Sequence, residues 1–225
     1  MKTYKIASFS DLHERAESNV LEAAFYRGQL DLEWKLIPKV GRFELPPSYT
    51  RIGVELGLLE YFKDRAIPFI EMEPKDNWDW LSLAQHHGLP TRLLDWTRNI
   101  LVAAFFAVEH DYDSDSVIYA FKPEAKLRAE IKFDPFKLKD GVFAYMPRHT
   151  SRRVIAQQGC FTVYANPEIE APSELLERYV IAHKFRHPLK LLLNRYGINR
   201  STLFPDLDGL AKYLEWTYTD EAFWH

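Results

Sequence analysis

The pattern of apolar and polar positions is most informative between residues 86 and 111, which read HHGLPTRLLDWTRNILVAAFFAVEHD. Just before and into this stretch, large or apolar residues recur at helical spacing, at Trp80, Leu83, Ala84 and His87. Gly88 follows them, and we expect it to end that helix in the left-handed conformation that glycine adopts readily. Pro90 then prevents the helix from restarting.

A strand and a buried helix are predicted directly after this stop. Residues 91–97 mix polar and apolar side chains and predict a short strand or extended loop. A helix is then predicted from about 99 to 109, because residues 100–108 carry no polar side chain and such a helix is buried on all sides. Its first N–H groups cannot reach water and need a side-chain oxygen. The candidates for this cap are Asp95, Thr97 and Asn99.

The rest of the chain alternates between strand and helix patterns. Strands are predicted at 4–9, 21–28, 117–121, 161–164 and 179–182, and helices at 10–18, 50–65 and 189–196, with a last helix opening at Asp206 or Asp208. Residues 124–148 mix helix formers with prolines and a glycine, and we interpret them as an insertion or flap. With no repeat or linker, the chain predicts a single α+β domain over 1–225, with its core at about 20–215. We expect a twisted, mostly antiparallel sheet packed around the helix at 100–108.

Composition narrows the class of protein. The chain has 225 residues, of which 47% are hydrophobic and 15% aromatic, which excludes disorder. A net charge of −3 argues against a surface devoted to binding nucleic acid phosphates. Cys160 is the only cysteine, so no internal disulfide can form and a reducing cytoplasm is the expected compartment. No apolar run approaches the roughly 20 residues of a membrane span, so no membrane partner is expected.

Several common kinds of site are disfavoured. His86 and His87 are adjacent, and adjacent helical side chains point about 100° apart, so we expect no metal. No Gly-x-Ser-x-Gly motif supports a serine nucleophile, and no dinucleotide or phosphate-loop fingerprint is present. What remains is a polar set on apolar scaffolding, namely Arg27, Gln29, His86, Arg92, Asp95, Thr97, Arg152 and Gln158.

Each part of this polar set has a structural and a functional interpretation. Arg27 either makes a surface ion pair or lies at a strand end lining a cleft, where Gly28 lets a ligand or backbone approach closely. Arg92 and Asp95 either form a buried pair that neutralises itself or belong to a site for an anionic ligand. Strand-end arginines beside a helix N-terminus suit phosphate or pyrophosphate.

Four segments of the chain resemble the FRG domain family. The signature-like segment is AQHHGLPTRLLDWTRNILVAAFFAV, and residues 25–29, FYRGQ, match the aromatic-Arg-Gly triplet that gives the family its name. RRVIAQQGCF at 152–161 and LFPDLDGLAKYL at 203–214 are similar too. Together the four segments span nearly the whole chain.

The resemblance implies a distant relationship to the ADP-ribosyltransferases, both in fold and in the use of NAD as a substrate. By that analogy Arg27 holds the NAD phosphates, and Gln29, His86, Arg92, Thr97 and Arg152 line the nucleotide site. The late glutamate of those enzymes should fall near Gln158, where this chain has an amide that cannot act as a general base. Asp95 is then the carboxylate that could substitute, with Gln158 facing the ribose.

Two functions follow from this resemblance. One is an ADP-ribosyltransferase-like or NAD-hydrolysing enzyme that binds NAD or another nucleotide. The alternative is a non-enzymatic binding or effector module that retains the pocket. The resemblance leaves open whether an acceptor would be a protein or a nucleic acid.

Overall fold

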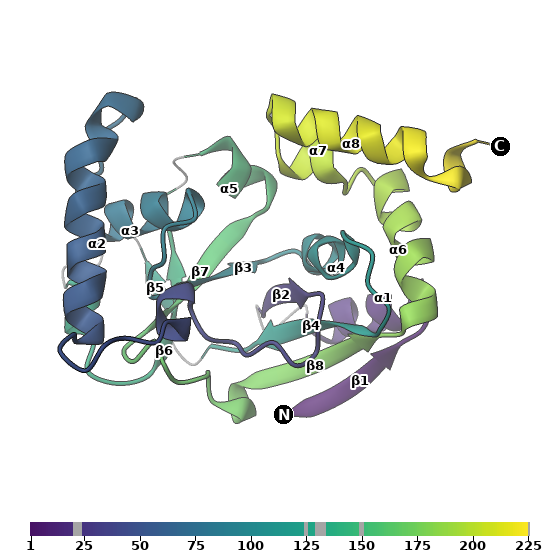
Figure 1. The fold of residues 1–225 in the computed structure, drawn as a ribbon. Coiled ribbons are helices and arrows are strands. Elements are labelled where there is room, and N and C mark those ends of the chain that lie inside the picture. The colour runs from purple at the N-terminus through teal and green to yellow at the C-terminus, as the bar shows by residue number, and fades with distance from the viewer. Residues whose placement is uncertain (20–23, 124–125, 129–133, 149–150, 225) are drawn as a thin grey trace.

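One mixed sheet runs through the protein (Figure 1). The computed structural model describes residues 1–225 except 20–23, 124–125, 129–133, 149–150 and 225. Within the described residues, eight strands lie in the order β1-β8-β4-β2-β3-β7-β6-β5. They are β1 Lys2–Ile6, β2 Phe25–Gln29, β3 Leu93–Thr97, β4 Ser116–Phe121, β5 Lys126–Arg128, β6 Val142–Met146, β7 Gly159–Tyr164 and β8 Leu176–Ile181. The pairs β1 with β8 and β5 with β6 are parallel, and the remaining pairs are antiparallel.

Helices follow most of the strands. They are α1 Phe9–Ser18, α2 Arg51–Ala66, α3 Asn77–His86, α4 Ile100–Val108, α5 Arg152–Ala156, α6 His183–Arg195, α7 Arg200–Leu203 and α8 Leu207–Thr219. Short 3₁₀ turns occupy Lys39–Arg42, Ile67–Phe69, Pro135–Lys137, Ser173–Leu175 and Glu221–Phe223. The predicted α+β class and mostly antiparallel sheet are confirmed. None of the described helices is both long enough and apolar enough to cross a membrane.

The buried helix α4 packs against β2 at the centre of the fold (Figure 1). Asn99 caps it, because its side-chain oxygen accepts from the Leu101 N–H at 2.9 Å. A Cβ atom on Gly28 would lie 1.9 Å from the Ala103 carbonyl oxygen, so only glycine permits this approach. The sequence-based expectation that Gly28 allows a close approach is confirmed, and the approaching group is the α4 backbone.

Three hydrophobic clusters divide the sheet. One joins α4 and α6 to Tyr26 of β2 and Ile118 of β4. A second joins α2 and α3 to β3, β6 and β7 farther along the sheet. The third includes Leu94 and Trp96 of β3 together with Leu36, which lies in the connection after β2. Since side chains alternate along a strand, Leu94 and Trp96 occupy the opposite face from Leu93, which belongs to the α2–α3 cluster.

Two sequence-based expectations change. Within 124–148, the segment Val142–Met146 forms β6 and pairs with β7, so this part belongs to the sheet and is no flap. Part of that predicted segment, residues 124–125 and 129–133, lies outside the described residues. Arg27 lies in the middle of β2, with Gln29 as the last residue of the strand, and therefore does not occupy a strand end.

Candidate functional site

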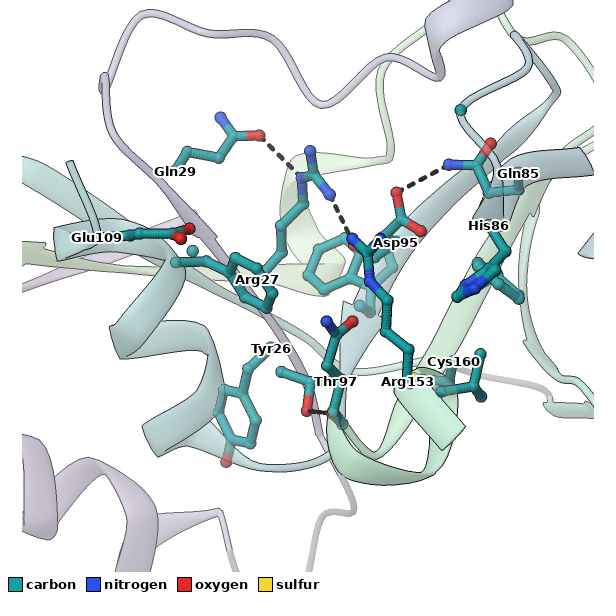
Figure 2. A pocket seen from close by; sticks show the side chains of 18 of the residues that line it. Tyr26, Arg27, Gln29, Gln85, His86, Asp95, Thr97, Glu109, Arg153 and Cys160 are labelled. Carbon is teal, nitrogen blue, oxygen red and sulfur yellow. Dashed lines mark hydrogen bonds between the residues drawn. The ribbon is translucent and has the colours of Figure 1, made fainter. Parts of the chain in front are cut away.

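The two central strands β2 and β3 separate almost as soon as they meet. They share a single residue pair, Tyr26 with Thr97, whereas each pairs over five residues with its other neighbour. Beyond that pair, the backbone groups of β3 that face β2 need other partners. The opening is the place where polar side chains from several elements gather (Figure 2).

Arg27 provides one of these partners. Its Nη1 donates to the backbone carbonyl of Asp95 at 2.8 Å, and its Nε donates to the Gln29 Oε1 at 3.0 Å. Gln29 is 3% exposed and uses its Nε2 to donate to the Trp34 carbonyl at 2.8 Å. A carbonyl only accepts, so the Gln29 amide is oriented with its oxygen toward Arg27. Burial lowers the pKa of Arg27, yet a guanidinium remains charged at neutral pH.

Asp95 places its carboxylate in the same opening. The side chain is exposed, and its Oδ2 accepts from the Gln85 Nε2 at 2.8 Å. Gln85 lies near the end of α3 and accepts through its Oε1 from the Thr91 hydroxyl at 2.7 Å. Asp95 is therefore held by a neutral amide and forms no direct ion pair among the described residues.

Helix α5 contributes a second arginine. Arg153 lies with its guanidinium 4.4 Å from the ring centre of Phe204, and burial lowers its pKa, whereas the charge of Asp95 opposes that shift. Figure 2 shows the guanidinium groups of Arg27 and Arg153 on the same side of the Asp95 carboxylate, with Gln85 on the other side. Within the described part of the chain, neither arginine forms an ion pair with a carboxylate. Their charges are therefore available to a ligand.

Other groups shape this opening. Thr97 donates from its hydroxyl to the Gln157 carbonyl at 2.6 Å, which ties β3 to the end of α5. His86 lies at the end of α3, and burial, followed by the nearby charges of Arg153 and His87, lowers its pKa. Glu109 follows α4 and forms an ion pair with Arg200 of α7, so its charge is compensated.

The opening leads into a cavity of about 760 Å³, which we call the central cavity. Its lining includes Arg27, Gln29, Gln85, His86, Asp95, Thr97, Glu109, Arg153 and Gln157, with aromatic surface from Tyr26, Trp34 and Phe106. Ligand cavities typically measure about 300–1,000 Å³ and combine apolar walls with a few polar groups. The central cavity has the size and lining of a site for a small molecule.

Five of the eight predicted site residues meet in the central cavity. They are Arg27, Gln29, His86, Asp95 and Thr97. The cavity lining does not include Arg92, Arg152 or Gln158.

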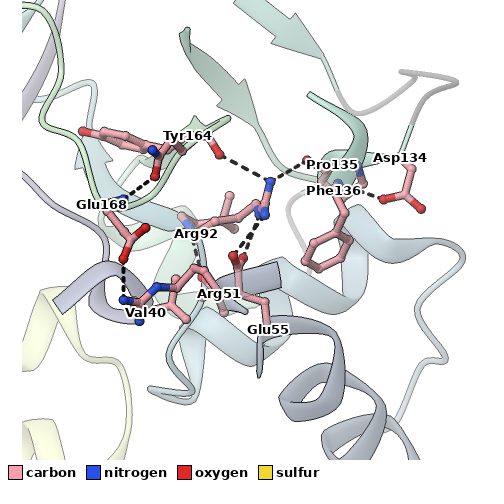
Figure 3. Close-up of polar contacts among 12 residues, drawn as sticks. Val40, Arg51, Glu55, Arg92, Asp134, Pro135, Phe136, Tyr164 and Glu168 are labelled. Atoms are coloured by element: carbon pink, nitrogen blue, oxygen red, sulfur yellow. Dashed lines mark hydrogen bonds and ion pairs between the residues drawn. The ribbon is translucent and has the colours of Figure 1, made fainter. Parts of the chain in front are cut away.

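The predicted pairing of Arg92 with Asp95 is wrong. Arg92 binds Glu55 of α2 through both Nε and Nη2, at 2.7 and 3.0 Å, and the two side chains are 3% and 2% exposed (Figure 3). Its Nη1 donates to the Pro135 carbonyl at 3.1 Å, and the Phe136 ring lies 4.8 Å from the guanidinium carbon. Burial raises the pKa of Glu55, while Arg92 opposes the shift. Arg92 therefore fastens α2 to β3, and its donors do not face the cavity.

Arg152 and Gln158 do not line the cavity, but each is next in sequence to a residue that does. Both are exposed, while Arg153 and Gln157 of the same segment line the cavity. Gln158 has a φ of +47°, the left-handed conformation, and its carbonyl accepts from the Arg98 N–H at 3.2 Å. Gln158 lies where the backbone turns from α5 into β7. Gln157 directs its side-chain amide to the Leu203 carbonyl at 3.1 Å.

Sequence reasoning missed Gln85, Glu109, Arg153 and Gln157 as site residues. For α5 a signal was available, because Arg153, Val154 and Gln157 share one face of a helix. Gln85 follows the buried Leu81 by four residues and so lies on the inward face of α3. Glu109 carried no such signal, because it follows an apolar helix and reaches the cavity only through the packing of α4 on β2.

The protein is an α+β domain, and its cavity lies where the two central strands β2 and β3 separate. The family model of the FRG domain matches residues 22–116, which include β2, β3 and α4. This part of the chain therefore matches the FRG domain. No curated protein and no solved structure matches it. Its likeness to the ADP-ribosyltransferase fold remains a prediction, as do the resemblances at 152–161 and 203–214.

Across the described residues, no group of three His, Cys, Asp or Glu side chains is placed to hold a metal ion.

Proposed function

We propose that the central cavity binds NAD or a closely related nucleotide, and that the protein acts on the bond between nicotinamide and ribose. The observation that carries the proposal is the Asp95 carboxylate, which forms no direct ion pair among the described residues, in the same cavity as the guanidinium groups of Arg27 and Arg153. This arrangement suits a ligand that is anionic at one end and develops positive charge at the other.

The two arginines fit the anionic end of such a ligand. Guanidinium groups bind phosphate oxygens through several parallel N–H donors, and these charge-assisted hydrogen bonds are stronger than neutral ones. Arg27 is held at Nε and Nη1, and its Nη2 forms no hydrogen bond with a described residue. Aromatic rings of the cavity wall, such as Trp34 and Tyr26, offer surfaces for the flat rings of a dinucleotide.

The carboxylate fits the reacting end. When the bond between ribose C1′ and the nicotinamide nitrogen breaks, the bonding electrons go to nicotinamide, which leaves as a neutral base. The ribose then carries positive charge, which an ionised carboxylate stabilises. Water or an acceptor group adds at C1′ and gives up a proton. In this proposal Asp95 supplies the negative charge.

The binding module remains as the second candidate, because one observation favours it. The position expected to hold a glutamate carries amides at both Gln157 and Gln158, and an amide is no general base. Asp95 and Glu109 are the carboxylates in the described lining, and Glu109 is occupied by Arg200. A cavity with a single carboxylate free of a direct ion pair also suits binding without turnover.

One assay separates the two candidates. Purified protein is incubated with NAD labelled in the nicotinamide ring, and released nicotinamide is measured by chromatography. We expect release that is lost in Asp95→Asn and retained in Asp140→Asn, a matched change at an exposed aspartate outside the cavity lining. NAD binding without release supports the binding module, and absence of NAD binding contradicts the proposal in both forms.

A further inference from the structure

Gln85 links the Asp95 side chain to Thr91, a buried residue that lies just before β3, the strand that carries Asp95. Its Oε1 accepts from the Thr91 hydroxyl at 2.7 Å, and its Nε2 donates to the Asp95 Oδ2 at 2.8 Å. Thr91 is 2% exposed and lies just before β3, so the link runs from the protein interior to the cavity. The amide group of Gln85 is therefore held from both sides.

The direction of these hydrogen bonds follows from Asp95. An ionised carboxylate only accepts, so the NH₂ group of Gln85 must face Asp95 and its oxygen must face the Thr91 hydroxyl. The Thr91 Oγ1 also accepts from the Leu93 N–H at 3.1 Å, which fixes the hydroxyl in place.

A neutral donor has a particular effect on Asp95. An arginine or lysine in the same place would fix the carboxylate but would compensate its charge. The Gln85 amide fixes one carboxylate oxygen and leaves the negative charge in place. Among the described residues, no side chain or backbone group donates to the Asp95 Oδ1, and Asp95 lines the cavity. Gln29 holds Arg27 in the same manner, with an amide whose other end is fixed by a carbonyl.

We propose that Thr91 and Gln85 are positioning residues, which hold the Asp95 carboxylate in a single orientation while leaving it charged. The orientation itself depends only on the protein, whereas its effect on a ligand rests on the proposed function. The two parts can therefore be tested separately.

The first test uses nuclear magnetic resonance and needs no ligand. The chain has four glutamines, at positions 29, 85, 157 and 158, so selective ¹⁵N labelling gives a short set of side-chain amide signals. The Gln85 signals are those missing in Gln85→Leu. We expect them to shift in Asp95→Asn, because the carboxylate that accepts from the Gln85 Nε2 is then replaced by a neutral amide. In Thr91→Val, which keeps the shape but removes the hydroxyl, the two Gln85 amide protons should become more alike.

The second test measures the affinity for NAD by calorimetry. Gln85→Leu should weaken NAD binding about tenfold in the wild-type background, and should have no further effect when combined with Asp95→Asn. Equal losses in both backgrounds would show that Gln85 does not act through Asp95.

The outcomes distinguish this inference from the proposed function. If the Gln85 signals change in Asp95→Asn and the protein does not bind NAD, the result supports the positioning role and contradicts the proposed function. If the Gln85 signals are unchanged in Asp95→Asn, the positioning role is wrong, even if the protein binds NAD.

Discussion

The Arg27 guanidinium donates a 2.8 Å hydrogen bond to the backbone carbonyl of Asp95, across the split between β2 and β3. In an unbroken sheet, the backbone of β2 would provide this donor. Here the Arg27 side chain provides the donor instead. The cationic side chain of the site is therefore hydrogen-bonded to β3, the strand that carries the anionic side chain of Asp95. A change to Arg27 should therefore affect both the fold and the ligand.

Arg27→Lys tests the fold and ligand roles together. Lysine keeps the charge but cannot supply the planar fork of donors that reaches both Gln29 and Asp95. We expect a loss of about 2 kcal/mol in the free energy of unfolding, because hydrogen bonds to charged groups are worth about 1.5–3 kcal/mol. Urea unfolding measures this loss. NAD affinity should fall as well, and an unchanged affinity would show that the ligand does not contact Arg27.

Asp95→Asn should leave stability almost unchanged. Asp95 is exposed and is held by a neutral amide, and Arg92 depends on Glu55 instead. We expect the free energy of unfolding to change by about 0.5 kcal/mol or less, as at other exposed positions. A loss near 3 kcal/mol would indicate a buried partner for Asp95 and would contradict the structure.

Arg92→Met should be severely destabilising and tests the network in Figure 3. Removing one member of a buried ion pair costs about 3–5 kcal/mol, because the other charge is left without a partner. The double variant Arg92→Met with Glu55→Leu should recover most of this loss. Urea unfolding of the two single variants, Arg92→Met and Glu55→Leu, and of the double variant gives the coupling. The absence of recovery would mean that Glu55 is not the main partner of Arg92.

Gln158→Gly should stabilise the protein and leave NAD binding intact. Gln158 has a φ of +47°, where a side chain costs about 1 kcal/mol relative to glycine. Thermal unfolding should therefore show a higher midpoint for the variant. A glycine variant that folds but loses the ligand would restore Gln158 as a site residue.

His86 should make the stability of the protein depend on pH. Its pKa lies below the ordinary value of 6.5, chiefly through burial, so the unfolded chain binds more protons at this residue between the two values. Stability contributed by neutral His86 is present above pH 6.5 and is lost as the pH falls through the lowered pKa. His86→Gln should flatten this dependence in unfolding experiments. A bound anionic ligand should raise the pKa of His86, which histidine signals in nuclear magnetic resonance would report.

The features that were predicted correctly from the sequence depend on residues that are neighbours in the chain. Gly88 has a φ of +81°, and Asn99 caps the apolar helix α4, because glycine stops and side-chain caps are set by neighbouring residues. The gathering of Arg27, Asp95 and His86 was also predictable, since each residue belongs to a segment with a recognisable pattern.

Partners distant in sequence explain the errors. Glu55 lies 37 residues before Arg92, and nothing in the pattern of α2 distinguishes this glutamate from its exposed neighbours. The left-handed residue Gln158 turns the backbone between α5 and β7, and no glycine at that position marks the turn in the sequence. The split between β2 and β3 is a property of strand pairing, which a sequence pattern does not specify.

The most direct test of the central claim is a calorimetric titration of NAD into the wild-type protein, Arg27→Lys and Arg152→Lys. Arg152→Lys is the matched control, because Arg152 is exposed and lies outside the cavity lining. We expect saturable binding to the wild type and the control, with at least tenfold weaker binding to Arg27→Lys. Failure of the wild type to bind NAD, or equal affinities in all three proteins, would contradict the central claim.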